Sequence, residues 1–172
     1  QHAILCRRKG SMDAPDEITL DINKIAENQT YTFLSEVRYS PDHRYIAYTV
    51  DHSGNERYTL FIKDLDSGKI VDQGLTMDNS LEWANDSQTV FYSDKNADGD
   101  TDRVVKRHTL GCDPAEDVLV FEQPLQGYGV GIGKTKDKKY LVLATGSFDS
   151  LECFFLPADD FTGSFTSLHP LV

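Results

Sequence analysis

Three stretches of the chain follow one plan, and this internal repeat restricts the fold more than any other feature of the sequence. Each stretch has an alternating strand, a short turn with an aspartate, and then an apolar strand, and the copies recur at intervals of roughly 45 residues. The copies span 37–48, 81–92 and 130–143. A further pair of predicted strands follows each copy, within 58–73, 104–122 and 151–168.

Four strands per repeat of this length is typical of a propeller blade, a small antiparallel sheet that must stack on its neighbours to bury both faces. We therefore predict an all-β fold, a partial β-propeller with about three four-stranded antiparallel blades plus a remnant of another. The single domain 1–172 is expected to contain a remnant blade and connection at 1–36 and blades at 37–75, 80–123 and 128–170. The best helical candidate, residues 20–27, has at most two turns, with Asp21 as its cap.

Such a stack is incomplete as a propeller. Closed propellers usually have four to eight blades, and an open stack exposes sheet edges that can pair with other chains. The sequence therefore predicts either a fragment of a larger propeller or self-association through the open blade edges. The missing initiator methionine favours the fragment.

The repeated aspartates Asp42, Asp86 and Asp137 are predicted to form turns and not to act as acids. Pro41 presets the backbone for the first turn, and an aspartate in such a turn accepts from the backbone N–H two residues later. Aromatic residues of the repeats occupy strand positions that should pack against an adjacent blade. They are Tyr39, Tyr48, Trp83 and Tyr92.

The charge balance excludes two kinds of partner. With 17 basic and 28 acidic residues the net charge is −11, which disfavours nucleic acid and an anionic membrane surface.

No apolar run approaches the ~20 residues of a spanning helix, and the first residues reverse the charge order of a signal peptide. Cys6, Cys112 and Cys153 are too few and too scattered for a disulfide framework or a zinc site. We therefore expect a cytoplasmic protein.

The sequence lacks the residues that peptide hydrolysis needs. No Gly-x-Ser-x-Gly motif occurs, because Ser147 and Ser164 directly follow a glycine without the required spacing. The histidines pair with no recognisable nucleophile and acid, so each is expected to be on the surface or packed. They are His2, His43, His52, His108 and His169. We predict no catalytic residue and no cofactor in this chain, and assign no substrate-binding residue.

One acidic stretch is similar to the start of a calcium-binding loop, with Gly99 at the sixth position. Its oxygen-bearing residues are Asp94, Asn96, Asp98, Asp100 and Asp102. The twelfth position, which requires a bidentate glutamate, is Val105, and no helix is predicted on either side. We therefore predict a solvated acidic hairpin and no metal site. A calcium-dependent adhesion module stays as a third hypothesis.

A run of alternating glycines is predicted to lie on one face of a strand. The run is Gly127, Gly129, Gly131 and Gly133, which is not a dinucleotide-binding pattern. A bare strand face permits a close approach by another backbone, so we expect close packing near the central channel.

Several stretches carry a family resemblance: residues 6–11, 20–26, 40–48, 54–68, 83–92 and 107–120. The most specific is the run from Arg107-His108 through Asp113-Pro114 to Val120. Together they resemble oligopeptidase B, within the prolyl oligopeptidase group of serine peptidases. The resemblance weakens after Thr145. It implies a seven-bladed N-terminal propeller, of which this chain would be roughly the first three blades, above a C-terminal α/β-hydrolase domain with a serine, aspartate and histidine triad.

The resemblance implies a function that the chain does not perform alone. The parent enzyme would hydrolyse short peptides after basic residues, with the propeller gating substrate access, and this segment would be inactive. Its partners would be the C-terminal catalytic domain of the parent chain and peptide substrates, and its acidic charge would attract basic peptides. The alternative is a free-standing β-propeller-like protein-interaction module.

Overall fold

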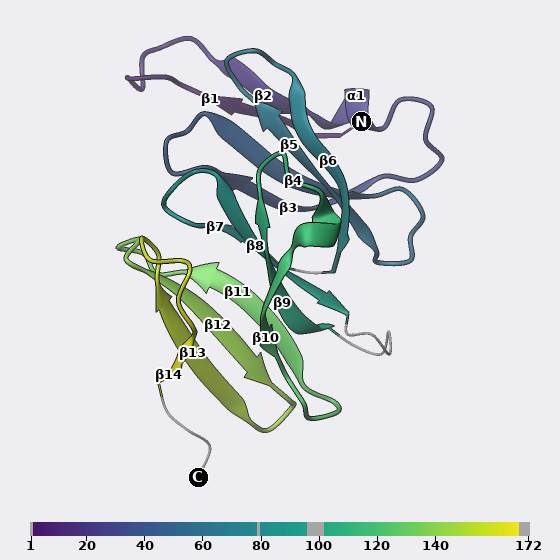
Figure 1. Cartoon of the computed structure of the whole chain (residues 1–172). Coiled ribbons are helices and arrows are strands. Elements are labelled where there is room, and N and C mark those ends of the chain that lie inside the picture. Colours follow the sequence, from purple (N-terminus) through teal and green to yellow (C-terminus); the bar gives the residue numbers. More distant parts are fainter. Residues whose placement is uncertain (1, 79, 96–101, 169–172) are drawn as a thin grey trace.

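The computed structural model describes residues 2–78, 80–95 and 102–168, and its strands form four antiparallel sheets in chain order (Figure 1). The first sheet pairs β1 (Ile4–Arg7) with β2 (Glu17–Asp21). The second contains β3 (Phe33–Tyr39), β4 (Tyr45–Asp51), β5 (Tyr58–Asp64) and β6 (Ile70–Met77). The third contains β7 (Leu81–Trp83), β8 (Thr89–Lys95), β9 (Asp102–Thr109) and β10 (Val118–Glu122). The fourth contains β11 (Gly129–Lys134), β12 (Tyr140–Gly146), β13 (Leu151–Pro157) and β14 (Thr166–Ser167).

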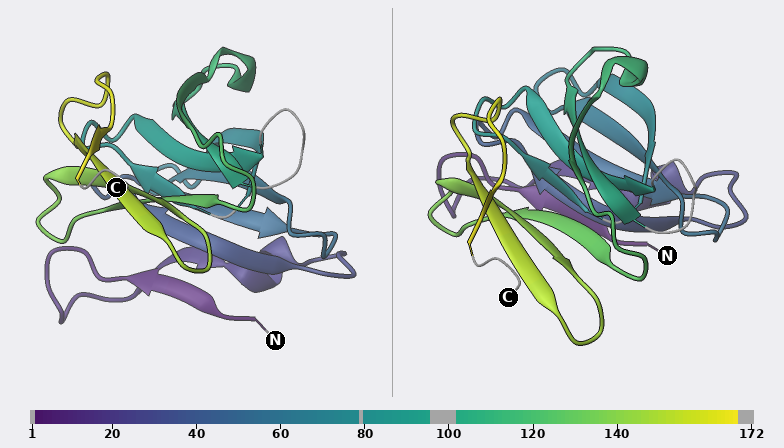
Figure 2. Two further views of the ribbon diagram at one scale, coloured as in Figure 1. Left: turned by 90° about the horizontal axis from the view of Figure 1, so that it is seen from below. Right: turned by 60° about the horizontal axis from the view of Figure 1, so that its bottom comes forward.

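Each four-stranded sheet runs in sequence order from its first strand to its last. Among the first strands, β7 contacts both β3 and β11, so the three form the inner edge of the stack. The sheets spread from this edge as an open fan, and no described sheet covers the outer face of β11–β14 (Figure 2). The predicted partial propeller, three four-stranded blades plus a two-stranded remnant, is confirmed.

The described chain has two short helices. The helix α1 (Ile22–Ile25) is a single turn, and the Asp21 side chain caps it by accepting from the N–H of Asn23, as predicted. The second, η1 (Pro114–Glu116), is a 3-10 turn between β9 and β10. Neither is long or apolar enough to cross a membrane.

The core consists of three apolar layers between consecutive sheets. Tyr48 packs with Leu20 of the first sheet, and Trp83 packs with Tyr45 of the second sheet. The two rings of Trp83 and Tyr45 are stacked, with centroids 6.3 Å apart. Trp83 also donates its Nε1–H to the backbone oxygen of Arg38 at 3.1 Å, which satisfies the buried indole. The expectation that these aromatic residues face an adjacent blade is confirmed for Tyr48 and Trp83.

The turn role of the repeated aspartates is confirmed. Asp42, Asp86 and Asp137 accept from the N–H two residues later, at 3.0, 3.0 and 3.2 Å. The residue after each aspartate has a left-handed backbone, which a side chain adopts at a cost. These residues are His43, Ser87 and Lys138, with φ of 60°, 57° and 60°.

The expectation that all four alternating glycines lie on one strand face is wrong, and no close packing of them is seen among the described residues. Gly127 lies in a turn before β11, with φ of 76°. Gly129 and Gly133 lie on β11, but a Cβ built on either would meet nothing within 4 Å, and one on Gly131 would meet only Ser80 Oγ at 3.9 Å. Val130 and its apolar neighbours occupy the covered face of β11, so the glycines lie on its other face. That face belongs to the last described sheet, and therefore lacks a packing partner there.

The outer face of the fourth sheet is apolar. Tyr140 is 39% exposed, Leu151 69% and Leu168 60%. A cavity of about 300 Å³ opens on this face, lined by residues that include Val142 and Phe155. This face carries apolar side chains, like the covered faces of the preceding sheets, but here those side chains are exposed.

Candidate functional site at the inner edge of the sheets

Charged side chains from three sheets meet at the inner edge of the stack. Glu36 and Arg38 come from β3, Glu82 from β7 and Lys134 from β11. Arg38 NH1 lies 2.7 Å from Glu36 Oε2, and its Nε lies 3.8 Å from Glu82 Oε2. We call these four residues the inner charged row. Because the first strands of propeller blades border the central channel, the row lies at the edge of the stack that would face such a channel.

The alternation of side-chain directions along a strand explains why these charged residues lie together. Along β7, Leu81 and Trp83 are fully buried in the layer against the second sheet, so Glu82 between them lies on the opposite side. Lys134 reaches from β11 and donates to Asn85 Oδ1 at 2.9 Å, in the turn after β7. The row therefore connects the second, third and fourth sheets.

The charges in the row are partly desolvated. Burial raises the pKa of Glu36; the charge of Arg38 opposes this rise and that of Glu82 adds to it. Burial lowers the pKa of Lys134, and the charge of Glu82 opposes that change. Groups in such a row can orient a charged peptide by ion pairing, but they include no serine, threonine or cysteine that could act as the nucleophile of a peptidase.

Two cavities share Tyr39 and His43, and one of them borders the row. One, of about 300 Å³, is lined by Glu82 and by lysines of the fourth sheet that include Lys134. The other, of about 460 Å³, lies against the first sheet and has five basic side chains. They are Arg7, Arg8, Lys9, His43 and Arg44.

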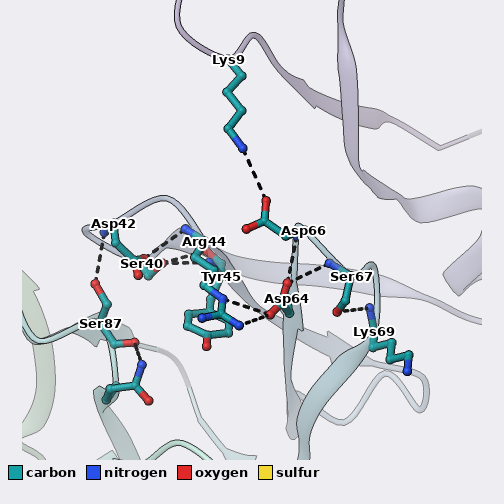
Figure 3. A network of polar contacts seen from close by, with 11 residues as sticks. Lys9, Ser40, Asp42, Arg44, Tyr45, Asp64, Asp66, Ser67, Lys69 and Ser87 are labelled. Atoms are coloured by element: carbon teal, nitrogen blue, oxygen red, sulfur yellow. Dashed lines mark hydrogen bonds and ion pairs between the residues drawn. The ribbon is translucent and has the colours of Figure 1, made fainter.

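Carboxylates already pair with the cations of the larger cavity. Figure 3 shows Arg44 on Asp64, with Nε and NH2 at 3.1 and 2.9 Å from Oδ2, and Lys9 reaching across to Asp66 at 3.4 Å. The other two pairs are Arg7 with Glu17 at 2.7 Å and Arg8 with Asp16 at 2.8 Å. This cavity therefore carries little net positive charge, which argues against a dedicated anion site.

The same view shows how the turn of Asp42 is held. Ser40 Oγ donates to Asp42 Oδ1 at 2.5 Å, and the Asp42 N–H is bound by Ser87 Oγ of the third sheet at 3.1 Å (Figure 3). Burial alone would raise the pKa of Asp42, but the bonds from Ser40 and the Arg44 N–H lower it. The carboxylate is thus a fixed acceptor in the turn.

The histidines lie apart from one another. His2 is exposed, His43 occupies its turn, and His52 has Nδ1 at 3.1 Å from Thr32 Oγ1. His108 is fully buried between Asp72 and Asp117. No histidine within 2–168 is hydrogen-bonded to both a carboxylate and a hydroxyl or thiol. His169 lies outside the described residues.

The acidic hairpin falls mostly outside the described residues. Of its five candidate ligands, the structure describes neither Asn96, Asp98 and Asp100 nor the side chain of Asp102. Asp94 is described, and its carboxylate binds Arg57 at 3.2 Å and Lys106 at 2.9 Å. Across the described parts of the chain, no group of histidine, cysteine or acidic side chains could hold a metal ion.

Comparisons with known proteins agree with this architecture. The sequence matches the family described as prolyl oligopeptidase, N-terminal beta-propeller domain, over residues 1–170. It is 32% identical to dipeptidyl aminopeptidase BI of Pseudoxanthomonas mexicana and 28% identical to protease 2 of Moraxella lacunata. The matches cover 91% and 92% of this chain, but only 22% and 24% of those proteins.

Solved structures give the same result. Oligopeptidase B from Leishmania major superposes with a TM-score of 0.84 at 25% identity, over 95% of this chain and 23% of that one. Oligopeptidase B from Trypanosoma brucei has a TM-score of 0.78 at 27% identity, over 95% and 23%. The chain thus spans less than a quarter of those two structures. It belongs to the family of prolyl oligopeptidase N-terminal β-propeller domains.

Proposed function

We propose that this chain is the start of the propeller of an oligopeptidase B-like serine peptidase that hydrolyses short peptides after basic residues. The observation that carries the proposal is the agreement of the family match with three stacked blades whose first strands share one inner edge. The catalytic domain would follow in the same polypeptide, and this segment alone would not hydrolyse peptides. The blades would correspond to 37–75, 80–123 and 128–170, after a remnant at 1–36.

In this proposal the propeller restricts access to the catalytic domain, and the inner charged row contacts the peptide on its way. Glu36 and Glu82 would accept a basic side chain of the peptide at close range, whereas Arg38 and Lys134 balance their charge, so the row would orient the peptide and not attract it from a distance. The net charge of −11 supports attraction of basic peptides over a longer range. A cytoplasmic location is part of the same proposal.

Two assays on the full-length protein test the two parts separately. Cleavage of an arginyl peptide amide, blocked by a serine-directed reagent, supports the peptidase, and its absence would reject the peptidase. For the row, E36Q/E82Q should lower kcat/KM for basic peptides several-fold at low salt and leave kcat unchanged. The control is D16N, an exposed carboxylate paired with Arg8 away from the row. An unchanged kcat/KM in E36Q/E82Q would reject the row as a contact while leaving the peptidase intact.

The outer face of the fourth sheet supports a second candidate function, a protein-interaction module. Its exposed apolar side chains, such as Tyr140 and Leu151, would then bind another protein or a second copy of the chain. Sedimentation of the full-length protein distinguishes the two. A monomer in which this face is protected favours the peptidase propeller, and concentration-dependent association that L151K abolishes favours the module.

A further inference from the structure

A buried histidine joins two sheets at the side of the stack away from the inner edge. His108 lies on β9 of the third sheet and has no exposed surface. Asp72 approaches it from β6, the outermost strand of the second sheet, and Asp117 approaches it from the residue before β10. The side chains of the two aspartates are 9% and 3% exposed. Figure 1 shows the segment between β9 and β10 beside β6.

Both ring nitrogens of His108 face a carboxylate. Nδ1 lies 2.7 Å from Asp117 Oδ1, and Nε2 lies 2.9 Å from Asp72 Oδ2. A neutral imidazole has one N–H and one lone pair, whereas an ionised carboxylate only accepts. Two hydrogen bonds to two carboxylates therefore require the imidazolium, with a proton on each nitrogen.

The surroundings support ionised carboxylates. The Tyr92 hydroxyl donates to Asp117 Oδ2 at 2.8 Å, and the N–H of Gly111 donates to Asp72 Oδ2 at 2.7 Å. The titratable groups of this cluster are Asp72 and Asp117, which contact His108, and Tyr92, which contacts Asp117. Burial alone would disfavour the charged histidine, but its bonds to Asp72 and Asp117 raise its pKa overall. Burial would likewise disfavour the Asp72 carboxylate, but the bond from His108 lowers its pKa.

We propose that Asp72, His108 and Asp117 form a proton-dependent clamp that holds the second and third sheets together. With the proton, His108 ties β6 to β9 and to the start of β10. Without it, one ring nitrogen presents a lone pair to a carboxylate less than 3 Å away, and the β6 side of the contact separates first, because Asp72 is the partner from the other sheet. The clamp is a property of the fold and does not depend on the peptidase proposal.

The pH range over which the clamp stays closed follows from the directions in which the pKa values of His108 and Asp72 are shifted. A raised pKa in the folded state means that stabilisation by His108 is complete below its ordinary pKa and is lost as pH rises through the raised value. A lowered pKa means that stabilisation by Asp72 is complete above its ordinary value and is lost as pH falls through the lowered one. The clamp is therefore closed between the lowered pKa of Asp72 and the raised pKa of His108, and it opens as pH rises through the latter.

Nitrogen NMR of the full-length protein tests the protonation directly. We expect both ring nitrogens of His108 to carry protons at neutral pH. Their two signals should change together, as the ring loses one proton, at a pH above the range of an ordinary histidine. A neutral His108 with one protonated nitrogen at neutral pH would overturn the clamp, because one carboxyl group would then have to hold the proton.

Hydrogen exchange with mass spectrometry tests the mechanical consequence. After correction for intrinsic rates, peptides covering β6 and 107–118 should lose protection as pH rises, while β5 should not. D72N keeps an acceptor but removes the charge, so β6 should exchange about tenfold faster at neutral pH and open at lower pH.

The matched control is D66N, which removes an exposed carboxylate in the turn between β5 and β6 whose one ion pair among the described residues is with Lys9. Equal exchange of β6 in D72N and D66N, or a pH response no larger in β6 than in β5, would contradict the clamp. H108Q gives a further check, since glutamine cannot titrate and should make exchange of β6 independent of pH in this range.

Discussion

Tyr45 and Tyr140 occupy the same place in two repeats, yet only one of them is in the core. Each opens the second strand of its sheet, and each has its N–H bound by a hydroxyl five residues earlier, Ser40 at 2.9 Å and Thr135 at 3.1 Å. Tyr45 is 6% exposed and stacks on Trp83, whereas Tyr140 is 39% exposed and contacts Phe155 of its own sheet.

The difference shows what each level of structure contributes. The hairpin around each tyrosine is a local product of the turn aspartate and the hydroxyl before it, so both copies form it. Burial of the ring depends on the next sheet, which brings Trp83 onto Tyr45 and brings no described residue of another sheet onto Tyr140. The repeat therefore predicts the hairpins, and stacking decides which of their side chains become core.

Removing the ring that covers Tyr45 should have the largest effect. W83A deletes a fully buried indole between two sheets, and should lower the free energy of unfolding by about 3–5 kcal/mol. W83F, which keeps a ring in the layer, should lose clearly less. Urea denaturation measures both, and a loss below about 1 kcal/mol for W83A would show that Trp83 does not join the sheets.

Truncating Tyr45 should have the second-largest effect on the free energy of unfolding, and truncating Tyr140 should have much less. Y45A should cost about 2–4 kcal/mol, because it leaves a cavity under Trp83. In the described chain Y140A removes a half-covered ring and should cost less than about 1 kcal/mol. The same urea experiment compares the variants, and equal losses would mean that the two faces are equally covered.

Glycine substitutions at the left-handed turn residues should have the smallest effect on the free energy of unfolding. K138G removes the strain of a φ of 60° at an exposed position, and should raise the free energy of unfolding by about 0.5 kcal/mol. S87G relieves a similar strain but also removes the hydroxyl that binds the Asp42 N–H across the contact between sheets. We therefore expect no gain from S87G in thermal unfolding. A gain equal to that of K138G would show that this hydrogen bond contributes nothing.

Local chemistry explains which features the sequence predicts. Alternation and turn residues lie within a few positions of each other, so the strands, the cap at Asp21 and the turns at Asp42, Asp86 and Asp137 are predictable. The inner charged row is not among the features predicted from the sequence, although the single charged residue between Leu81 and Trp83 is a signal that identifies Glu82.

Contacts between sheets explain the failures. Asp72 and His108 are 36 residues apart, and only stacking brings them together, so a sequence pattern for a packed histidine says nothing of its charge. His108 and Asp117 are only nine residues apart in the sequence, which is close enough to suggest that these two side chains pair. A bare strand face suggests close packing for the glycines of β11, but whether that face is covered depends on contacts with another sheet.

The most direct test of the propeller proposal compares the reactivity of Tyr45 and Tyr140 toward hydroxyl radicals. In a protein of the length of the relatives, a following blade should cover the outer face of β11–β14, and both tyrosines should be protected. In the 172-residue chain, Tyr45 should stay protected and Tyr140 should react. If Tyr140 reacts as strongly in the longer protein as in the 172-residue chain, no blade follows, and the proposed propeller is contradicted.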